Sequence, residues 1–301
     1  MPSKGESTDY TLAELMAILA AKEIKDGDRV FVGIGVPMIA AFLAIHTHAP
    51  NAMLMFEGGY LGSHPPVACT DVGDSVLGFG APSITSTWRT FSDLQHGYCD
   101  IGIIGSAQVD KYGNVNSTAI LGSGTYENPK TRLPGSGGAN DIASSAGRLL
   151  IMARLEKRRF VPRVDYATSP GHVDGYESRW KTGLEGGGPT AVITDRAIFR
   201  FDKETKEMYL SHLYPGVSVE EVKKEISWDL TVAEVVEAVE PPTRGEVNFI
   251  RNYDPTDVIL RRRRLFDSID FSSWSRLAMA DWNKRTQRAW FGLVTRAAAF
   301  K

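Results

Sequence analysis

A strand, a helix and a second strand follow one another within the first 60 residues, and this order limits the folds open to the chain. The stretch RVFVGIG (29–35) is short and β-branched, PMIAAFLAIHTH (37–48) is apolar and opens on a proline, and NAMLMFEGG (51–59) holds a second apolar run. Strands joined through a helix lie parallel in one sheet. Because open α/β sheets bind ligands beyond the carboxyl ends of their strands, Glu57 is a candidate functional residue.

The rest of the chain continues this alternation as far as about residue 170. Thr11 and Glu14 form a capping box ahead of apolar residues at helical spacing, which predicts a helix over 12–24. The stretches TAVITDRAIFRF (190–201) and KEMYLSHLY (206–214) predict an antiparallel hairpin. We therefore predict an α/β fold with an open, mostly parallel sheet and an antiparallel hairpin at its edge.

Residues 261–301 differ in composition from this α/β domain, which we place at residues 1–260. The segment contains ten Lys or Arg and three Asp, opens with four arginines, and carries Trp274, Trp282 and Trp290 eight residues apart. This spacing predicts a basic, C-terminal helical extension with an aromatic face. Such a face packs on the protein's own body, on a partner subunit or on a membrane surface.

The composition narrows the partners and the compartment. The 301 residues carry a formal net charge of −2, which gives no overall attraction to nucleic acid. The two cysteines, Cys69 and Cys99, are too far apart for a metal-binding motif, so we expect neither a disulfide framework nor a metal site. No basic-then-apolar leader opens the chain and no apolar run is long enough for a membrane span, so a cytoplasmic protein is expected.

Dinucleotide binding is one alternative for the first strand and helix. Glu57 lies 22 residues after Gly35, a spacing similar to that of the dinucleotide-binding fingerprint. Met38, however, occupies the third glycine position, and Pro37 removes an N–H group where a pyrophosphate would bind. The fingerprint is therefore incomplete.

A serine hydrolase or a metal enzyme would each need a characteristic set of residues. The stretch GSGGA is not the GxSxG elbow of a hydrolase, although Ser136 with His172 or His64 would supply the residue types. His46 and His48 face different ways on a helix, so a surface or capping role is favoured over a pair of metal ligands.

Nucleophilic catalysis by Glu57 is the interpretation that uses most of these features. Gly58 and Gly59 have no side chains, so we expect them to give an acyl group and a large cofactor access to the carboxylate. Further along, GSGGAN (135–140) precedes a helical turn, and its backbone N–H groups are candidate donors to a developing oxyanion. A plain tight turn is the alternative for this loop.

Five stretches in a fixed order make a more specific pattern than any single motif. They are FEGG, AQVDKYGNVNST, PKTRLPGSGGAND, LEKRRFVPRVDYATSPG and VITDRAIFRFDKETKEMYL. In this order they resemble the β subunit of family I CoA-transferases, and within that family they are most similar to the glutaconate branch. The resemblance runs over about residues 10–260 and implies an open α/β sheet sandwich.

The resemblance implies roles for particular residues. Glu57 matches the nucleophile that carries CoA as a glutamyl thioester. The family's glycine motif matches Gly135, Gly137, Gly138 and Ala139, which assigns them as backbone donors to the oxyanion and the thioester. Asn116 is a further candidate, as a side-chain amide donor.

The resemblance also implies substrates and partners. Coenzyme A enters as acyl-CoA, no metal is needed, and the acids are small carboxylic acids, with dicarboxylic acids among them. A CoA-transferase α subunit is expected to complete the site in an α2β2 or larger heteromer. Relatives on this scaffold include CoA-thioester hydrolases and a decarboxylase, so a hydrolase, a lyase or a non-catalytic subunit stays an alternative.

Overall fold

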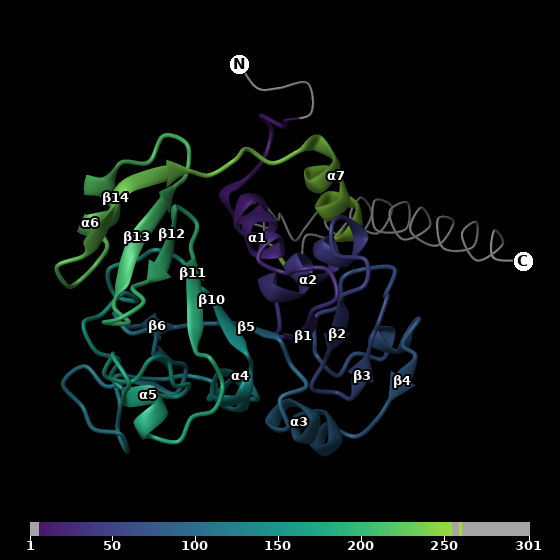
Figure 1. Cartoon of the computed structure of the whole chain (residues 1–301), viewed down its shortest axis with the longest axis horizontal. Coiled ribbons are helices and arrows are strands. Elements are labelled where there is room, and N and C mark those ends of the chain that lie inside the picture. The colour runs from purple at the N-terminus through teal and green to yellow at the C-terminus, as the bar shows by residue number, and fades with distance from the viewer. Residues whose placement is uncertain (1–5, 255–258, 261–301) are drawn as a thin grey trace, which may run out of the picture.

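The computed structural model describes residues 6–254, 259 and 260, which are drawn in colour in Figure 1. The main sheet is built from β1 (Arg29–Val32), β2 (Met53–Met55), β3 (Tyr60–Leu61), β4 (Ser83–Ile84), β5 (Ile101–Gly105), β10 (Arg148–Met152), β11 (Pro189–Ile193), β12 (Ala197–Phe201), β13 (Met208–Leu213) and β14 (Thr231–Ala238). The spatial order is β14-β13-β12-β11-β10-β5-β1-β2-β3-β4. Two small hairpins lie outside it, β6 (Gln108–Val109) with β7 (Val115–Asn116) and β8 (Ala119–Ile120) with β9 (Thr131–Arg132).

The helices connect these strands. They are α1 (Leu12–Lys22), α2 (Val36–His46), α3 (Thr87–Gln95), α4 (Ala139–Ser145), α5 (Ser178–Lys181), α6 (Val219–Lys224) and α7 (Arg244–Tyr253). A 3₁₀ turn also spans Ser75–Gly78. The first helix begins at the predicted Thr11–Glu14 capping box and ends two residues earlier than predicted. The extension predicted over residues 261–301 lies outside the part of the chain that the structure describes.

The centre of the sheet is parallel, as predicted. Strand β1 pairs in parallel with β2 on one side and with β5 on the other, and β5 pairs in parallel with β10, which pairs in parallel with β11. The strand, helix and strand at 29–59 thus form the predicted crossover, and Glu57 follows the carboxyl end of β2.

The predicted antiparallel hairpin edge is confirmed, and it is larger than expected because the stretch 190–201 forms two strands and β14 is added. Strands β11, β12 and β13 pair antiparallel in succession, and β14 then adds to β13 in parallel. On the opposite edge, β3 turns back antiparallel on β2, and β4 pairs antiparallel with β3. The turn between β2 and β3 contains Glu57.

Two apolar cores lie on the two faces of the sheet. Along β1, Val30 and Val32 belong to one core and Phe31 to the other, because successive strand side chains point to opposite faces. The first core is closed by α1, α2 and α7, and the second by α3, α4 and α6. Figure 1 shows α1, α2 and α7 gathered together, with α3 and α4 well away from them.

Helix α7, near the end of the described chain, packs against the residues at its start. Arg251 donates to the fully buried carboxylate of Glu14 at 2.8 Å and pairs with Asp9 at 2.9 Å. The buried charge of Glu14 is therefore compensated, which a lone buried carboxylate would not be. Within the described segments of the chain, no helix combines the length and the apolar character that crossing a bilayer requires.

Candidate functional site

Glu57 lies in the tight turn that joins β2 to β3. The N–H of Phe56 donates to the carbonyl of Tyr60 at 3.1 Å, and the N–H of Gly59 donates to the carbonyl of Phe56 at 2.9 Å. These bonds hold the turn at the carboxyl end of a parallel strand, where the side chain of Glu57 is partly buried. The position agrees with the one predicted from the sequence.

Gly58 and Gly59 have a different role from the predicted one, which was access for the substrate. A Cβ atom at Gly58 would lie 2.6 Å from the carbonyl oxygen of Val72, and a Cβ at Gly59 would overlap the carbonyl oxygen of Thr85. Gly59 also has a φ of +91° and accepts a 2.8 Å hydrogen bond from the N–H of Thr85. The space beside both glycines is filled by protein backbone, so they allow the turn to pack against residues 72 and 85.

We predict that Gly59→Ala lowers the free energy of unfolding by about 2–5 kcal/mol, because positive φ strain and overlap with backbone add together. Gly97→Ala is the matched control, since Gly97 has a φ of +80° but no atom within 4 Å of the point that a Cβ would occupy. It should cost only about 1–2 kcal/mol. Urea unfolding of both variants measures the difference, and equal losses would contradict the packing role.

The glycine loop and Glu57 are brought together, although 81 residues separate them in sequence. The N–H of Gly138 donates to Oε1 of Glu57 at 3.1 Å, and Gly138 is the N-cap residue of α4. A Cβ at Gly138 would lie 2.5 Å from both that oxygen and Cζ of Phe91. At this glycine the absence of a side chain does give room to the carboxylate.

The other members of the predicted donor set divide into two groups. The N–H of Gly135 donates to the carbonyl of Ser117 at 2.9 Å, and the N–H of Ala139 donates to the carbonyl of Ser136 at 3.0 Å. Both groups shape the loop, which corrects the expectation that they are open donors. Among the described residues, the N–H of Gly137 has no hydrogen-bond acceptor, so in the predicted set the N–H groups of Gly137 and Gly138 are the ones that the loop itself does not use.

Asn116 is a structural residue in this arrangement, which differs from its predicted role as a free amide donor. Its Nδ2 donates to Oε1 of Gln108 and to the carbonyl of Ala119, both at 2.7 Å, and its side chain is fully buried. Both amide hydrogens are therefore in use. Its Oδ1 accepts from the N–H of Thr118, and the segment 117–118 in turn holds Leu133 and Gly135.

The serine hydrolase alternative is not supported by the histidines. His172 is buried, and its Nε2 bonds to the carbonyl of Pro189 at 2.9 Å. Burial lowers the pKa of His172 to about 4. The Nδ1 atom of His64 bonds to the carbonyl of Gly62. Neither ring forms a hydrogen bond with Ser136 in the described structure.

Burial raises the pKa of Glu57 above its ordinary value of 4.5. The hydrogen bond from Gly138 opposes this rise, whereas the nearby carboxylates of Asp71 and Asp141 add to it. Asp141 lies in the first turn of α4, where Nε2 of Gln95 donates to it at 3.2 Å. No ion pair with Glu57 occurs within the described residues, so the carboxylate is partly desolvated without a paired cation and is more basic than an exposed glutamate.

We predict that kcat/KM falls as the pH is lowered through the raised pKa of Glu57, because only the carboxylate attacks. Asp141→Asn removes a like charge, lowers the pKa of Glu57 and should move this acidic limb to lower pH. Asp174→Asn is the control, since Asp174 is not among the groups that shift Glu57. A limb that stays in place in Asp141→Asn would contradict the assignment to Glu57.

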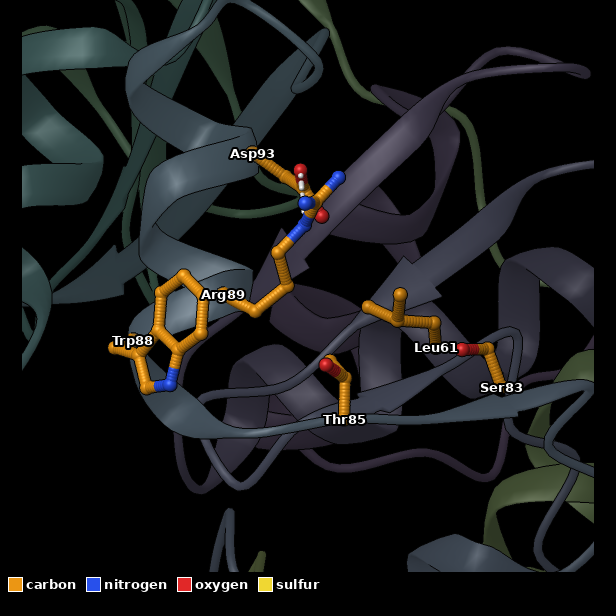
Figure 2. A pocket seen from close by; sticks show the side chains of 6 residues that line it. All are labelled: Leu61, Ser83, Thr85, Trp88, Arg89 and Asp93. Atoms are coloured by element: carbon orange, nitrogen blue, oxygen red, sulfur yellow. Dashed lines mark ion pairs between the residues drawn. The ribbon is translucent and has the colours of Figure 1, made fainter.

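A cavity of about 500 Å³ is lined by residues of α3, β3 and β4 and by Thr85, which follows β4. Figure 2 shows Trp88, Arg89 and Asp93 on α3, and Leu61 of β3, Ser83 of β4 and Thr85 complete the lining. Arg89 is paired with Asp93 at 3.0 Å. The cavity meets the turn through Thr85, which contacts Gly59. As for metals, the described residues contain no group of three His, Cys, Asp or Glu side chains arranged to hold an ion.

Comparison with known proteins identifies this arrangement. The sequence profile named coenzyme A transferase matches residues 13–225. The chain belongs to the coenzyme A transferase family. It is 40% identical to the B subunit of 3-oxoadipate CoA-transferase from Pseudomonas knackmussii, over 80% of this chain and 92% of that protein. It is also 40% identical to the B subunit of glutaconate CoA-transferase from Acidaminococcus fermentans, over 84% of this chain and 96% of that one.

Solved structures of coenzyme A transferase relatives have the same fold. The crystal structure of glutaconate coenzyme A-transferase from Acidaminococcus fermentans superposes with a TM-score of 0.77 at 39% identity, covering 84% of this chain and 98% of that chain. The decarboxylase AibA/AibB superposes with a TM-score of 0.71 at 25% identity, covering 83% and 97%. The chain is thus the β subunit type of the coenzyme A transferase family, and the subunit names of its relatives imply a heteromer.

Three residues at or near the site have no clear sequence signal. Phe91 contacts the place where a Cβ of Gly138 would be, and Asp141 acts on Glu57 through its charge. Arg179, whose contacts reach the far end of α4, is one of two basic residues in the stretch ESRWK (177–181). The signals that locate them are contacts between distant segments.

Proposed function

We propose that this chain is the β subunit of a CoA-transferase that moves CoA between small carboxylic acids, with Glu57 as the covalent carrier. The observation that carries the proposal is the 3.1 Å hydrogen bond from the N–H of Gly138 to Oε1 of Glu57. It joins a desolvated carboxylate to a backbone donor, and covalent acyl transfer uses both.

The proposed reaction begins with attack by Glu57 on an acyl-CoA. A carboxylate oxygen of Glu57 bonds to the acyl carbon, and the C–S bond breaks to release CoA thiolate and leave a mixed anhydride. The thiolate then attacks Cδ of Glu57, and the bond between Cδ and the bridging oxygen of the anhydride breaks. This step releases the first acid as its carboxylate and leaves a glutamyl-CoA thioester, and a second acid reverses the sequence.

The geometry suggests separate tasks for the N–H groups of Gly137 and Gly138. Gly138 is bonded to Oε1, so its N–H orients the resting carboxylate and stays on that oxygen when Cδ becomes tetrahedral and Oε1 gains charge. The N–H of Gly137, with no acceptor in the described structure, is assigned to an oxygen of the substrate or the thioester. Gly135, Ala139 and Asn116 support the loop.

Dicarboxylic acids are the proposed substrate class. The relatives are named for 3-oxoadipate and glutaconate, which are both dicarboxylic acids, and each is 40% identical to this chain. Because Glu57, Asp71 and Asp141 place several negative charges in this region, we assign the cation for a second substrate carboxylate to the partner subunit. The proposed partner is a CoA-transferase α subunit in an α2β2 or larger assembly, and the proposed location is the cytoplasm.

An exchange assay tests the proposal. The chain is co-expressed with its α subunit, and the purified complex is given labelled acyl-CoA together with a panel of monocarboxylic and dicarboxylic acids. We expect label to move between acids faster than free CoA accumulates. Release of CoA without exchange would indicate a thioester hydrolase, and loss of CO₂ would indicate a lyase, as in the decarboxylase that shares the fold.

A further inference from the structure

Arg179 is a buried arginine whose hydrogen bonds within the described residues all go to main-chain carbonyl groups. It lies on α5 and is 6% exposed. Its Nη2 donates to the carbonyls of Ala143 (2.7 Å) and Ser144 (3.1 Å), its Nη1 to Gly171 (2.7 Å) and Pro170 (3.2 Å), and its Nε to Gly186 (2.7 Å). A guanidinium group has five N–H donors, so every donor of Arg179 is used.

The charge of Arg179 has no carboxylate partner within the described residues. Burial lowers the pKa of Arg179 to about 10, so the group is still protonated at neutral pH. A buried cation is costly unless dipoles or counter-charges compensate it. Here the compensation comes from the carbonyl groups, and two of them belong to the last residues of α4, where the helix dipole is negative.

The end of α4 is fixed in place by further backbone contacts. The N–H of Gly186 donates to the carbonyl of Ser144 at 3.0 Å, and the N–H of Gly187 donates to the carbonyl of Ala146 at 3.1 Å. A Cβ at Gly186 would lie 2.6 Å from the carbonyl oxygen of Ser144. At its middle, α4 rests on β5 so closely that a Cβ at Gly102 would overlap Ile142.

The other end of α4 holds Glu57. Gly138, the N-cap residue, donates to Oε1 of Glu57. The helix spans only 139–145, or about 10 Å at 1.5 Å per residue, and it is supported on the sheet between its ends. Because α4 is short and rigid, a displacement of its carboxyl end also displaces the N–H of Gly138 at its amino end.

We propose that Arg179 is a positioning residue for Glu57, which it reaches through α4 by fixing the helix end opposite the Gly138–Glu57 hydrogen bond. This inference rests on the proposed function, because it assigns the purpose of the arrangement to catalysis by Glu57. Within the described residues Arg179 forms no hydrogen bond with Glu57 or with the loop before α4, so its effect on both passes through the helix.

Arg179→Lys tests the proposal because it keeps the charge but has three donors for five carbonyls. With α4 less firmly held, the Gly138 hydrogen bond weakens, and this bond lowers the pKa of Glu57. We expect kcat of the complex to fall roughly tenfold to a hundredfold. We also expect the acidic limb of kcat/KM to move to higher pH. Arg200→Lys is the matched control, since Arg200 is a partly buried arginine that pairs with Glu23 away from α4.

A second measurement needs no activity. Because ionised Glu57 costs folding free energy, Glu57→Gln should stabilise the full chain increasingly as the pH rises from the unfolded to the folded pKa of Glu57. In the Arg179→Lys background this gain should extend to higher pH and become larger, whereas in the Arg200→Lys background it should match the wild-type chain. If Arg179→Lys does not fold, Arg179→Gln, which buries no charge, takes its place.

The outcomes separate this inference from the proposed function. The stabilisation by Glu57→Gln is compared across pH in each background. If Arg179→Lys leaves this pH dependence unchanged, or if Arg200→Lys changes it equally, the positioning role is overturned. The positioning role is also overturned if the wild-type complex is active and the acidic limb of kcat/KM lies at the same pH in Arg179→Lys as in the wild type. Absence of CoA exchange in the wild-type complex would instead count against the proposed function, and the stability comparison would remain readable.

Discussion

Glu57→Gln is expected to lower CoA exchange by the complete complex by at least about a thousandfold, because an amide oxygen does not form the anhydride or the thioester. The substitution keeps the shape of the side chain and an acceptor for the N–H of Gly138. Loss of activity would therefore report on the nucleophile. The measurement is the initial rate of label exchange between acyl-CoA and a free acid, with both subunits present.

Stability provides the control for this variant. Since burial raises the pKa of Glu57, the ionised side chain destabilises the folded state at pH values above that pKa. Glu57→Gln should consequently unfold at a temperature no lower than the wild-type chain at pH 7. An inactive variant with a strongly lowered melting temperature would point to damaged folding, and full exchange activity in Glu57→Gln would remove Glu57 from the mechanism.

Gly138→Ala is expected to lower kcat by about a hundredfold to a thousandfold, the effect typical of losing one oxyanion donor. The added Cβ would lie 2.5 Å from Oε1 of Glu57 and from the ring of Phe91. Because α4 is held at its other end, the clash is expected to move the carboxylate off the N–H. Steady-state kinetics with the complex should show the loss mainly in kcat, with KM for acyl-CoA much less affected.

Gly105→Ala is the matched control for an added methyl group. Gly105 ends β5, at the carboxyl ends of the parallel strands, where the Glu57 turn also begins. A Cβ at Gly105 would have no atom within 4 Å. It should leave kcat within about twofold of the wild-type value, since an uncrowded surface substitution has little effect. Equal losses in Gly138→Ala and Gly105→Ala would show that the hydrogen bond to Glu57 is not what the first substitution removes.

The framework of the fold could be predicted because its signals are local. The Thr11–Glu14 capping box starts α1, and the apolar runs at 29–35 and 51–59 form β1 and β2 on either side of α2. A parallel pair joined by a helix then places Glu57 beyond the end of β2. Strand β14 pairs with β13 by contacts between segments, and local patterns did not predict it.

The detailed roles within the site depend on contacts that a sequence does not contain. Gly58 and Gly59 looked like access for a substrate, but the backbones at Val72 and Thr85 fill that space. Asn116 was expected to be a free donor, whereas its amide is used in the turn that supports the glycine loop. A carboxamide in a buried turn satisfies the local backbone first, because an unpaired polar group there is costly.

Helix α5 contains two neighbouring residues whose burial the sequence does not predict. Hydropathy would bury Trp180 and expose its neighbour Arg179, yet Trp180 is 78% exposed and Arg179 is 6% exposed. The arginine is buried because it alone supplies enough donors for the carbonyls of three separate segments. Only the folded arrangement of 143–144, 170–171 and 186 shows that requirement.

Intact-mass analysis of the chain, after the complex has been incubated with acyl-CoA, tests the central claim most directly. The account predicts a mass increase equal to CoA minus one water, located on the peptide that contains Glu57, reversed by an acceptor acid and absent in Glu57→Gln. A complex that exchanges CoA at its full rate while this chain carries no adduct, or carries it at another residue, would contradict the account.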